Sequence, residues 1–449
     1  MIEVPPPPPP PLAEQKKGGG RKLAIILSIV ALVVVGAIVA VFIVVFKTLN
    51  ADPGDDVPQP HRAAVKAPRP AAGEPSWTAP DHHWVGLSKA WSADHGSLFD
   101  FKLQQRGLVS DGKRAIEFRD GYLETSSTAT AMVTAFDGAT GKRAWQTKLQ
   151  WAHTASPVAG NGVVIVPSGE ESTYGSPTPL DYVALDSATG KRLWRAHVDS
   201  RTISSDSSAL DDGRSQPGGA LLNGVFYYGD GNGVVGVDAR TGKKRYAFTS
   251  KKYSTNSAPI VAGGRIAVLA RPTPDDYPET YEVHTFPPDL KRYTSYKLPG
   301  SSYEPDQLAA NGDVLVSWGD SELSTTDVRT GRLLAHVKLD VLASYGGVIG
   351  RTLLVRDRAG ANDKLAGYDL LTGRKRWDVD PFPDDYSLGM LDVADGTALV
   401  AGDGLAIIDP NTGKSTFTRP TSFSVTGGLA APAGGHLVVS FDRGIAGYR

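Results

Sequence analysis

The chain contains no cysteine among its 449 residues. This absence excludes disulfide bonds, thiolate metal ligands and cysteine nucleophiles, and it neither supports nor opposes a location outside the cytoplasm. An excess of one charge is also missing, because 47 Lys and Arg residues balance 48 Asp and Glu residues. A large domain that is nearly neutral lacks the electrostatic footprint of a nucleic-acid-binding protein. We therefore expect no thiol chemistry and no nucleic-acid partner.

Short catalytic motifs are missing too. The chain has no Gly-x-Ser-x-Gly, no phosphate-binding loop and no His-Glu-x-x-His. His82, His83 and His95 lie near Asp81 without the spacing of metal ligands, which is typical of a solvated linker. Residues 229–233 lack the alternating acids and terminal Glu of an EF-hand, so we expect a hairpin turn there. The sequence offers no catalytic residue, no metal ligand and no cofactor-binding residue.

A long apolar run lies close to the N-terminus, at residues 23–46, and is interrupted only by Ser28 and Gly36. Roughly 20 apolar residues span a bilayer as a helix, whereas the apolar region of a cleaved signal peptide has roughly 7–15. Basic residues precede the run and acidic residues follow it, so the positive-inside rule places the N-terminus in the cytoplasm. The sequence predicts an uncleaved, single-pass helix in the plasma membrane, with the remainder of the chain outside the cytoplasm.

Proline marks the segments on either side of this run. Residues 1–22 form a basic cytoplasmic tail, in which the prolines at 5–11 favour an extended polyproline II helix. Residues 47–86 are rich in Pro, Ala, Asp and Gly, a composition that predicts a disordered and stiff extracytoplasmic linker. The folded part is therefore expected at residues 87–449.

A repeated phrase occupies much of this folded part. A clear copy, at residues 182–194, reads Tyr-Val-Ala-Leu-Asp-Ser-Ala-Thr-Gly-Lys-Arg-Leu-Trp. Further copies span Val133 to Trp145, Val234 to Tyr246, Leu365 to Trp377, Leu405 to Phe417 and, without the aromatic residue, Ser324 to Ala335. A period of roughly 40–50 residues that consists only of strand signals is typical of a β-propeller. We therefore predict an all-β fold of small radial sheets.

Each phrase contains an apolar strand, an Asp-x-x-Thr-Gly turn and a second strand. The Asp carboxylate can accept bonds from the backbone N–H groups that follow it, and the Gly supplies a positive φ. A large side chain four residues after the Gly can fill the space between two blades. We assign structural roles to the recurring residues, which are Asp137, Gly141, Trp145, Asp186, Gly190, Trp194, Asp238, Gly242, Asp327, Gly331, Asp369, Gly373, Trp377, Asp409 and Gly413.

Turns that contain Gly precede eight strand runs, which predicts an eight-bladed propeller. The fourth blade is the least regular, because Pro287–Leu290 replaces the usual turn, and seven blades is the alternative if this segment is an insertion. The final blade lacks its fourth strand, whereas residues 86–92 resemble an outermost strand with nothing before it. We expect these residues to complete the last blade, because such closure removes open sheet edges.

The Asp-x-x-Thr-Gly-Lys-x-x-Trp phrase resembles the repeat of the pyrroloquinoline-quinone (PQQ)-like β-propeller family over residues 87–449. One branch of that family contains quinone- and calcium-dependent dehydrogenases. Another contains bacterial scaffolds without a cofactor, similar to the propeller lipoprotein of outer-membrane assembly. The chain lacks the adjacent cysteines of the alcohol dehydrogenases, and no local motif matches their calcium-binding residues. The resemblance therefore implies the branch that has no cofactor.

In a four-stranded blade, connections B–C and D–A leave one face of the ring, and connections A–B and C–D leave the other. The long insertions at 168–181, 201–219, 271–280, 356–364 and 381–388 are all of the first kind. Functional loops on rigid scaffolds gather in this way. Our candidate binding residues are Tyr174, Asp211, Asp212, Arg214, Arg271, Asp275, Asp276, Tyr277, Asp384, Asp385 and Tyr386.

Together these patterns predict a protein- or glycan-binding scaffold in the cell envelope, attached to the membrane by one helix. Its partner would bind the face that carries the long insertions. Two alternatives remain open: a PQQ- and calcium-dependent oxidoreductase, and a sensory or regulatory membrane protein that signals through the cytoplasmic tail.

Overall fold

The computed structural model describes residues 62–64, 73–78, 80, 82–84, 87, 89–94, 101–123, 129–150, 157–169, 180–198, 218–255, 257–272, 281–298, 307–319, 322–339, 344–357, 364–381, 388–394, 396–402, 404–420, 429–441 and 444–449. These residues belong to one compact unit, Val57–Arg449. Within these ranges no helix is long and apolar enough to cross a membrane. The predicted helix at 23–46 and the tail at 1–22 lie outside the described residues.

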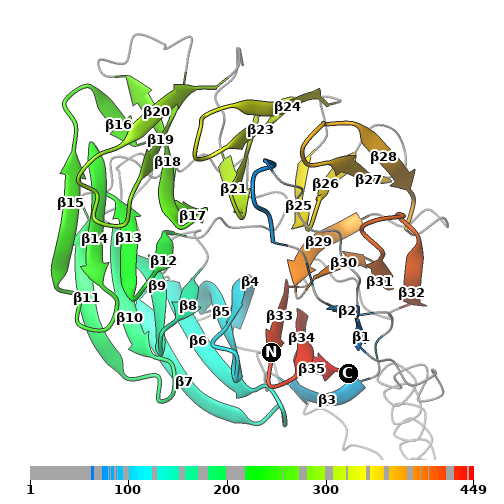
Figure 1. The fold of residues 1–449 in the computed structure, drawn as a ribbon. Coiled ribbons are helices and arrows are strands. Elements are labelled where there is room, and N and C mark those ends of the chain that lie inside the picture. Colours follow the sequence, from blue (N-terminus) through cyan, green and yellow to red (C-terminus); the bar gives the residue numbers. More distant parts are fainter. Residues whose placement is uncertain are drawn as a thin grey trace, which may run out of the picture. The chain divides into compact units, whose positions relative to one another are not determined.

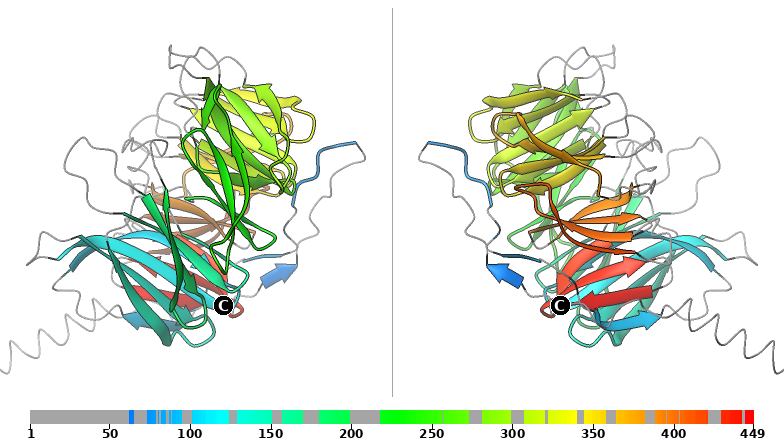
Figure 2. Two further views of the ribbon diagram at one scale, coloured as in Figure 1. Left: turned by 90° about the vertical axis from the view of Figure 1, so that its left-hand side faces the viewer. Right: turned by 90° about the vertical axis from the view of Figure 1, so that its right-hand side faces the viewer.

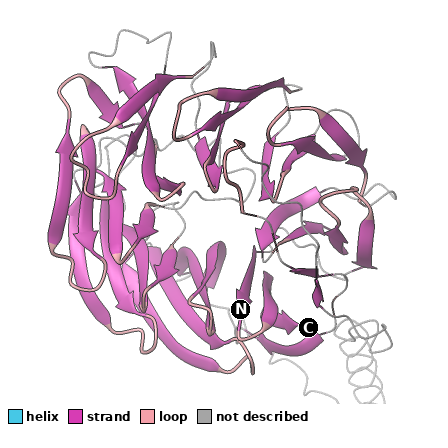
Figure 3. Cartoon of the chain, in the orientation of Figure 1, coloured by secondary structure: helices cyan, strands magenta, loops and turns pink. Residues whose placement is uncertain are grey.

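Eight antiparallel sheets stand around a ring, which confirms the predicted eight-bladed β-propeller (Figure 1, Figure 3). Each sheet is one blade, and its strands are named A to D from the axis outward. Blades one to four consist of β4 (Phe101–Ser110), β5 (Arg114–Leu123), β6 (Ala129–Asp137), β7 (Arg143–Gln150); β8 (Val158–Gly160), β9 (Val163–Gly169), β10 (Leu180–Asp186), β11 (Arg192–Val198); β12 (Ala220–Leu222), β13 (Val225–Gly229), β14 (Gly233–Asp238), β15 (Lys244–Thr249); and β16 (Tyr253–Thr255), β17 (Ile260–Ala262), β18 (Arg265–Pro272), β19 (Glu282–Phe286), β20 (Thr294–Lys297). In blade four, strand A is β17, and an additional strand, β16, also pairs with strand B.

The other four blades repeat this order. They consist of β21 (Gln307–Asn311), β22 (Val314–Gly319), β23 (Glu322–Asp327), β24 (Leu333–Lys338); β25 (Ser344–Ile349), β26 (Thr352–Asp357), β27 (Lys364–Asp369), β28 (Lys375–Val379); β29 (Leu388–Ala394), β30 (Thr397–Gly402), β31 (Gly404–Ile408), β32 (Ser415–Pro420); and β33 (Leu429–Ala433), β34 (His436–Phe441), β35 (Gly444–Tyr448), β3 (Lys89–Asp94). The seven-bladed alternative is wrong, because Pro287–Leu290 forms the turn from β19 to β20 in a complete fourth blade.

Strands from the two ends of the propeller close the ring. β3 pairs with β35, so that Ser92 lies opposite Ala446. The indole Nε1 of Trp91, on β3, donates to the carbonyl of Gly138 in blade one at 3.0 Å. Closure through a segment near residues 86–92 is therefore confirmed, and the paired strand covers the outer edge of β35.

Part of the predicted disordered linker is ordered against the ring, which corrects the expectation for residues 47–86. We call the described residues between 73 and 87 the strap. The strap buries Trp77, Trp84 and Leu87, which are 5%, 2% and 1% exposed. A proline-rich composition predicts a linker only when it has no apolar surface to bury, and these side chains supply such surface. A further strand that precedes the strap in the chain, β1 (Arg62–Ala64), pairs with β2 (His82–Trp84), which is part of the strap.

The strap lies on the face of the ring that carries the tight turns. Ser76 Oγ donates to Asp313 Oδ2 at 2.7 Å, in the A–B turn of blade five. Trp84 N–H donates to Thr397 Oγ1 at 3.0 Å, directly after the A–B turn of blade seven. Figure 2 shows the strap, in blue, on one side of the ring. We call this side the tight-turn face and the opposite side, where B–C and D–A connections leave the strands, the long-connection face.

Candidate functional site

Arg271 is the one candidate binding residue that lies within the described ranges. It lies near the end of β18, opposite Ser254 of β16, and its side chain is half-buried. The remaining candidates lie outside the described residues, so their role stays a prediction: Tyr174, Asp211, Asp212, Arg214, Asp275, Asp276, Tyr277, Asp384, Asp385 and Tyr386.

A polar and aromatic cluster occupies the same blade as Arg271. His284 of β19 is 2% exposed, and its Nε2 lies 3.2 Å from Glu282 Oε2. The imidazole stacks on Tyr293 at a centroid distance of 4.5 Å and meets the edge of Tyr253 at 4.7 Å. Burial lowers the pKa of His284, although Glu282 acts in the opposite direction. The cluster thus holds His284 inside the blade, between Tyr253 and Tyr293 and beside Glu282.

Blade two has an ion-pair network at the long-connection end of its outer strands. Asp181, 5% exposed, accepts a bond from Arg195 Nε at 2.5 Å, and its other oxygen lies 2.8 Å from His197 Nδ1. The His197 side chain is 65% exposed. Sequence reasoning missed this group, because the three residues lie on two strands and carry no motif. The network lies at the long-connection end of blade two and leaves the His197 side chain exposed there.

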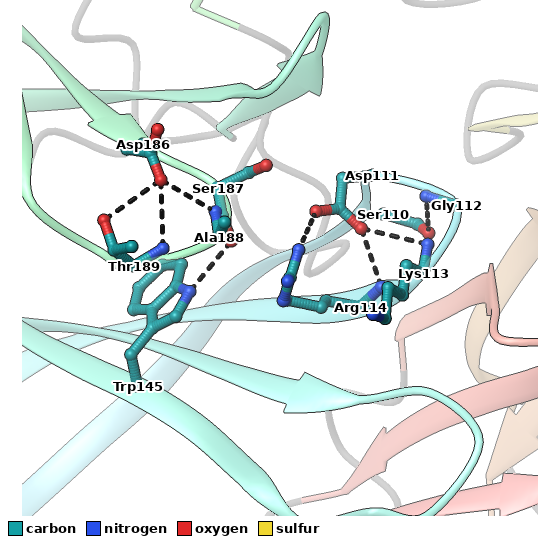
Figure 4. A network of polar contacts seen from close by, with 10 residues as sticks. All are labelled: Ser110, Asp111, Gly112, Lys113, Arg114, Trp145, Asp186, Ser187, Ala188 and Thr189. Atoms are coloured by element: carbon teal, nitrogen blue, oxygen red, sulfur yellow. Dashed lines mark hydrogen bonds and ion pairs between the residues drawn. The ribbon is translucent and has the colours of Figure 1, made fainter.

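The repeated Asp-x-x-Thr-Gly turns lie at the C–D ends of the blades, on the tight-turn face. In blade two, Asp186 Oδ1 accepts bonds from Ala188 N at 3.1 Å, Thr189 N at 3.0 Å and Thr189 Oγ1 at 3.0 Å (Figure 4). In blade three, the bonds from Thr241 hold the pKa of Asp238 below its usual value. These carboxylates are therefore engaged by the hydrogen bonds of their own turns.

The tryptophans of the repeat connect each turn to the blade before it. Trp145 of β7 donates from Nε1 to the carbonyl of Ser187 at 2.9 Å, across the boundary between blades one and two (Figure 4). Its ring lies so close to Gly190 that a Cβ there would approach Trp145 Cε3 to 2.5 Å. Trp194 and Trp377 make the same bond to the turns of blades three and seven. Position 190 therefore requires glycine for two reasons: the backbone has a positive φ, and the Trp145 ring leaves no room for a Cβ.

A buried charged group lies where the first and last blades meet. Glu117 and Arg119, both on β5, are 1% and 5% exposed, and Arg119 Nη2 lies 3.0 Å from Glu117 Oε1. Ser440 of β34 donates its hydroxyl to the same carboxylate. The alternation of charged and apolar residues at 115–119 is a sequence signal for this pair, but the partner lies more than 300 positions away. The hydrogen bond between Ser440 and Glu117 therefore forms only when the first and last blades have come together.

The described residues do not supply the donor set of a quinone and calcium site. Among them, no group of three or more His, Cys, Asp or Glu residues could hold a metal ion. The charged groups above are ion pairs and turn bonds, which leave their carboxylates occupied.

Comparisons with known proteins find the same kind of repeat and the same fold. A family model described as "Outer membrane protein assembly factor BamB" matches residues 62–273, somewhat less than half of the chain. BamB of Moraxella catarrhalis is similar in structure, with a TM-score of 0.50, 14% identity and coverage of 81% of this chain and 99% of that one. The chain carries a PQQ-like β-propeller.

Other solved structures share the fold of this PQQ-like propeller. The quinohemoprotein alcohol dehydrogenase of Comamonas testosteroni has a TM-score of 0.52 and 13% identity, with coverage of 81% of this chain and 76% of that one. The computationally designed protein Ika8 has a TM-score of 0.50 and 11% identity, with coverage of 77% and 96%. No curated protein sequence matches the chain significantly. Because these similarities include an assembly factor, a dehydrogenase and a design, they establish the fold alone.

Proposed function

We propose that the chain is a membrane-anchored, extracytoplasmic propeller that acts as a protein- or glycan-binding scaffold in the cell envelope. The partner binds the long-connection face. The anchor is the apolar run at residues 23–46, with the N-terminus in the cytoplasm.

The course of the strap carries this proposal. The strap holds the ring at the A–B turns of blades five to seven, on the tight-turn face. β1, which precedes the strap in the chain, pairs with β2 of the strap. The proposal therefore assigns the tight-turn face to the anchored side of the ring and the long-connection face to the partner.

The alternatives fit the described residues less well. An oxidoreductase of this kind needs a calcium site, and among the described residues no group of three or more His, Cys, Asp or Glu residues could hold a metal ion. The likeness to the alcohol dehydrogenase is one of fold and carries no chemistry. A sensor that signals through the cytoplasmic tail would share the anchor and the propeller, so partner identification must separate it from a scaffold.

Site-specific photo-cross-linking in intact membranes tests the proposal. Lys142 and Lys148 lie at opposite ends of the outer strand of blade one, and both are exposed. A cross-linker at Lys148 or at Lys364, both at long-connection ends, is expected to capture the partner, whereas one at Lys142 is not. Alanine substitution of Asp275, Asp276 and Tyr277, combined with that of Asp384, Asp385 and Tyr386, is expected to reduce the capture.

Undiminished capture by the six-alanine variant, or capture from Lys142 alone, would contradict the assignment of the binding face. The oxidoreductase is tested separately by reconstitution with PQQ and calcium. Dye reduction with alcohols or sugars would favour that enzyme over the scaffold.

A further inference from the structure

We propose that the tight-turn face is a docking surface for anionic phospholipid headgroups, so that the ring rests on the membrane as well as being tethered to it. This inference rests on the proposed membrane anchorage and adds a second, electrostatic contact. It uses residues that all lie within the described ranges.

The C–D turns form a basic rim around this face. In each of blades one to six, the turn from strand C to strand D carries one aspartate and at least two Lys or Arg residues. The rim residues are exposed, and they are Lys142, Arg143, Lys191, Arg192, Lys243, Lys244, Lys291, Arg292, Arg332, Arg374, Lys375 and Lys414. Clusters of basic residues near a bilayer are attracted to anionic lipids.

The acids of the same turns are engaged by hydrogen bonds within their own turns. Asp137, Asp186 and Asp238 each accept bonds from the backbone N–H and the hydroxyl of the Thr three residues later. The second oxygen of Asp186 pairs with Arg240 at 3.2 Å, and that of Asp238 pairs with Arg245 at 2.5 Å. The lysines at the turn tips are therefore the charges presented to an approaching surface.

Exposed apolar side chains occur at the same end of the blades. Among the described residues, the large apolar side chains that are exposed are Val261, Tyr293 and Leu333, at 36%, 38% and 44%. Val261 comes just before the A–B turn of blade four, Tyr293 follows its C–D turn, and Leu333 follows the C–D turn of blade five. Apolar and aromatic side chains beside basic residues are typical of surfaces that lie in the membrane interface.

The arrangement favours a lipid surface over a nucleic acid. The basic residues follow the circumference of a ring rather than a groove, and the exposed turn tips carry no row of aromatic rings on which bases could stack. The strap, which follows the proposed anchor in the chain, lies on the same face. A broad anionic plane therefore matches both the charge and the position of the rim.

Lysine footprinting of the full chain in lipid nanodiscs tests the inference. Discs of phosphatidylcholine alone are compared with discs that contain phosphatidylglycerol, and acetylation of each lysine is measured by mass spectrometry. Lys142, Lys191 and Lys291 are expected to react at least about fivefold more slowly in the anionic discs, since each basic residue near an anionic surface changes partitioning by about that factor. Lys148, Lys297 and Lys338, which are exposed at the opposite ends of their blades, are expected to be unchanged.

High salt provides a second readout. At 1 M ionic strength the screening length falls to about 3 Å, so the protection of the rim is expected to disappear. Equal acetylation of both sets of lysines in the two kinds of disc would overturn the inference, as would protection of the opposite set.

Two triple variants with the same charge change separate the rim from general electrostatics. K142E/K191E/K243E is expected to return Lys291 and Lys414 to their reactivity in neutral discs, whereas K148E/K297E/K338E is expected to keep them protected. Protection that survives in the first variant would refute a role for the rim.

Loss of the chain from phosphatidylcholine discs would instead refute the anchorage itself. The same footprint with added phosphatidylglycerol vesicles then still decides whether the tight-turn face binds anionic lipid. The two failures are therefore distinguishable.

Discussion

Adding one methyl group at Gly312 should displace the strap, and Gly224, in the equivalent turn of another blade, provides a matched control. Gly312 and Gly224 lie in the A–B turns of blades five and three, with φ of 60° and 74°. A Cβ at Gly312 would meet the Ser76 carbonyl at 2.5 Å and Trp77 Cα at 2.7 Å, whereas a Cβ at Gly224 would meet nothing within 4 Å. Both Gly312→Ala and Gly224→Ala therefore strain the backbone, but only Gly312→Ala introduces a methyl group that collides with the strap.

The magnitude follows from the contacts of the strap. A left-handed conformation costs an alanine about 1–2 kcal/mol, which both variants bear. Release of the strap removes the Trp77 contact as well, and removal of a buried tryptophan costs about 3–5 kcal/mol. Because 1.4 kcal/mol is a factor of ten, a loss of about 3 kcal/mol raises the opening of the strap by about 100-fold.

Hydrogen exchange on the full chain measures this difference. The amides of Ser76 and Thr78 donate to Asp313 and Asn311 at 3.2 Å and 2.9 Å, so a peptide covering 73–78 reports the docked state. We expect exchange of this peptide to accelerate about 100-fold in Gly312→Ala and to stay close to the parent in Gly224→Ala. Equal exchange in the two variants would refute the contact between the strap and the A–B turn.

Three further outcomes follow from the geometry. In denaturant titrations, Trp145→Ala is expected to lower the free energy of unfolding by about 3–5 kcal/mol, and Trp145→Phe by less. Leu333→Ala, which changes an exposed side chain, should alter the free energy of unfolding by no more than about 0.5 kcal/mol. Glu117→Gln is expected to cost about 3–5 kcal/mol in the same titrations, because it leaves Arg119 buried beside a neutral partner. Because burial lowers the pKa of His284 in the folded state, His284 binds a proton more readily in the unfolded chain as pH falls below about 6.5. The melting temperature should therefore fall on acidification, and it should fall less in His284→Phe. An identical pH profile for the two proteins would contradict this account.

Much of the blade architecture was predictable because its determinants are local. Asp186 bonds to the residues two and three positions later, so the turn is written in a few consecutive residues. The repeat then indicates the number of blades, and the missing fourth strand of the last blade indicates the closure by β3. The irregular turn at Pro287–Leu290 did not change the count, because the strands on both sides of it keep their pairing.

The candidate site was predictable only as a face of the ring. Topology assigns B–C and D–A connections to one side, but it does not say which of their residues meet. The ion pairs of Asp181 with Arg195 and His197 carry no motif, because strand pairing rather than sequence spacing brings them together. The long-connection face thus follows from the repeat, and its residues do not.

The sequence by itself determined the strand order, the turn chemistry and the eightfold repetition, because each depends on bonds between residues close in the chain. Only the tertiary structure decided that Trp77 and Trp84 cover the ring, since their partners lie more than 200 positions away and a proline-rich composition hides them. The same holds for Glu117 and Ser440 at the junction of the first and last blades. Burial of these groups becomes favourable only once the blades are in place, because the apolar and polar surfaces that they contact do not exist before then.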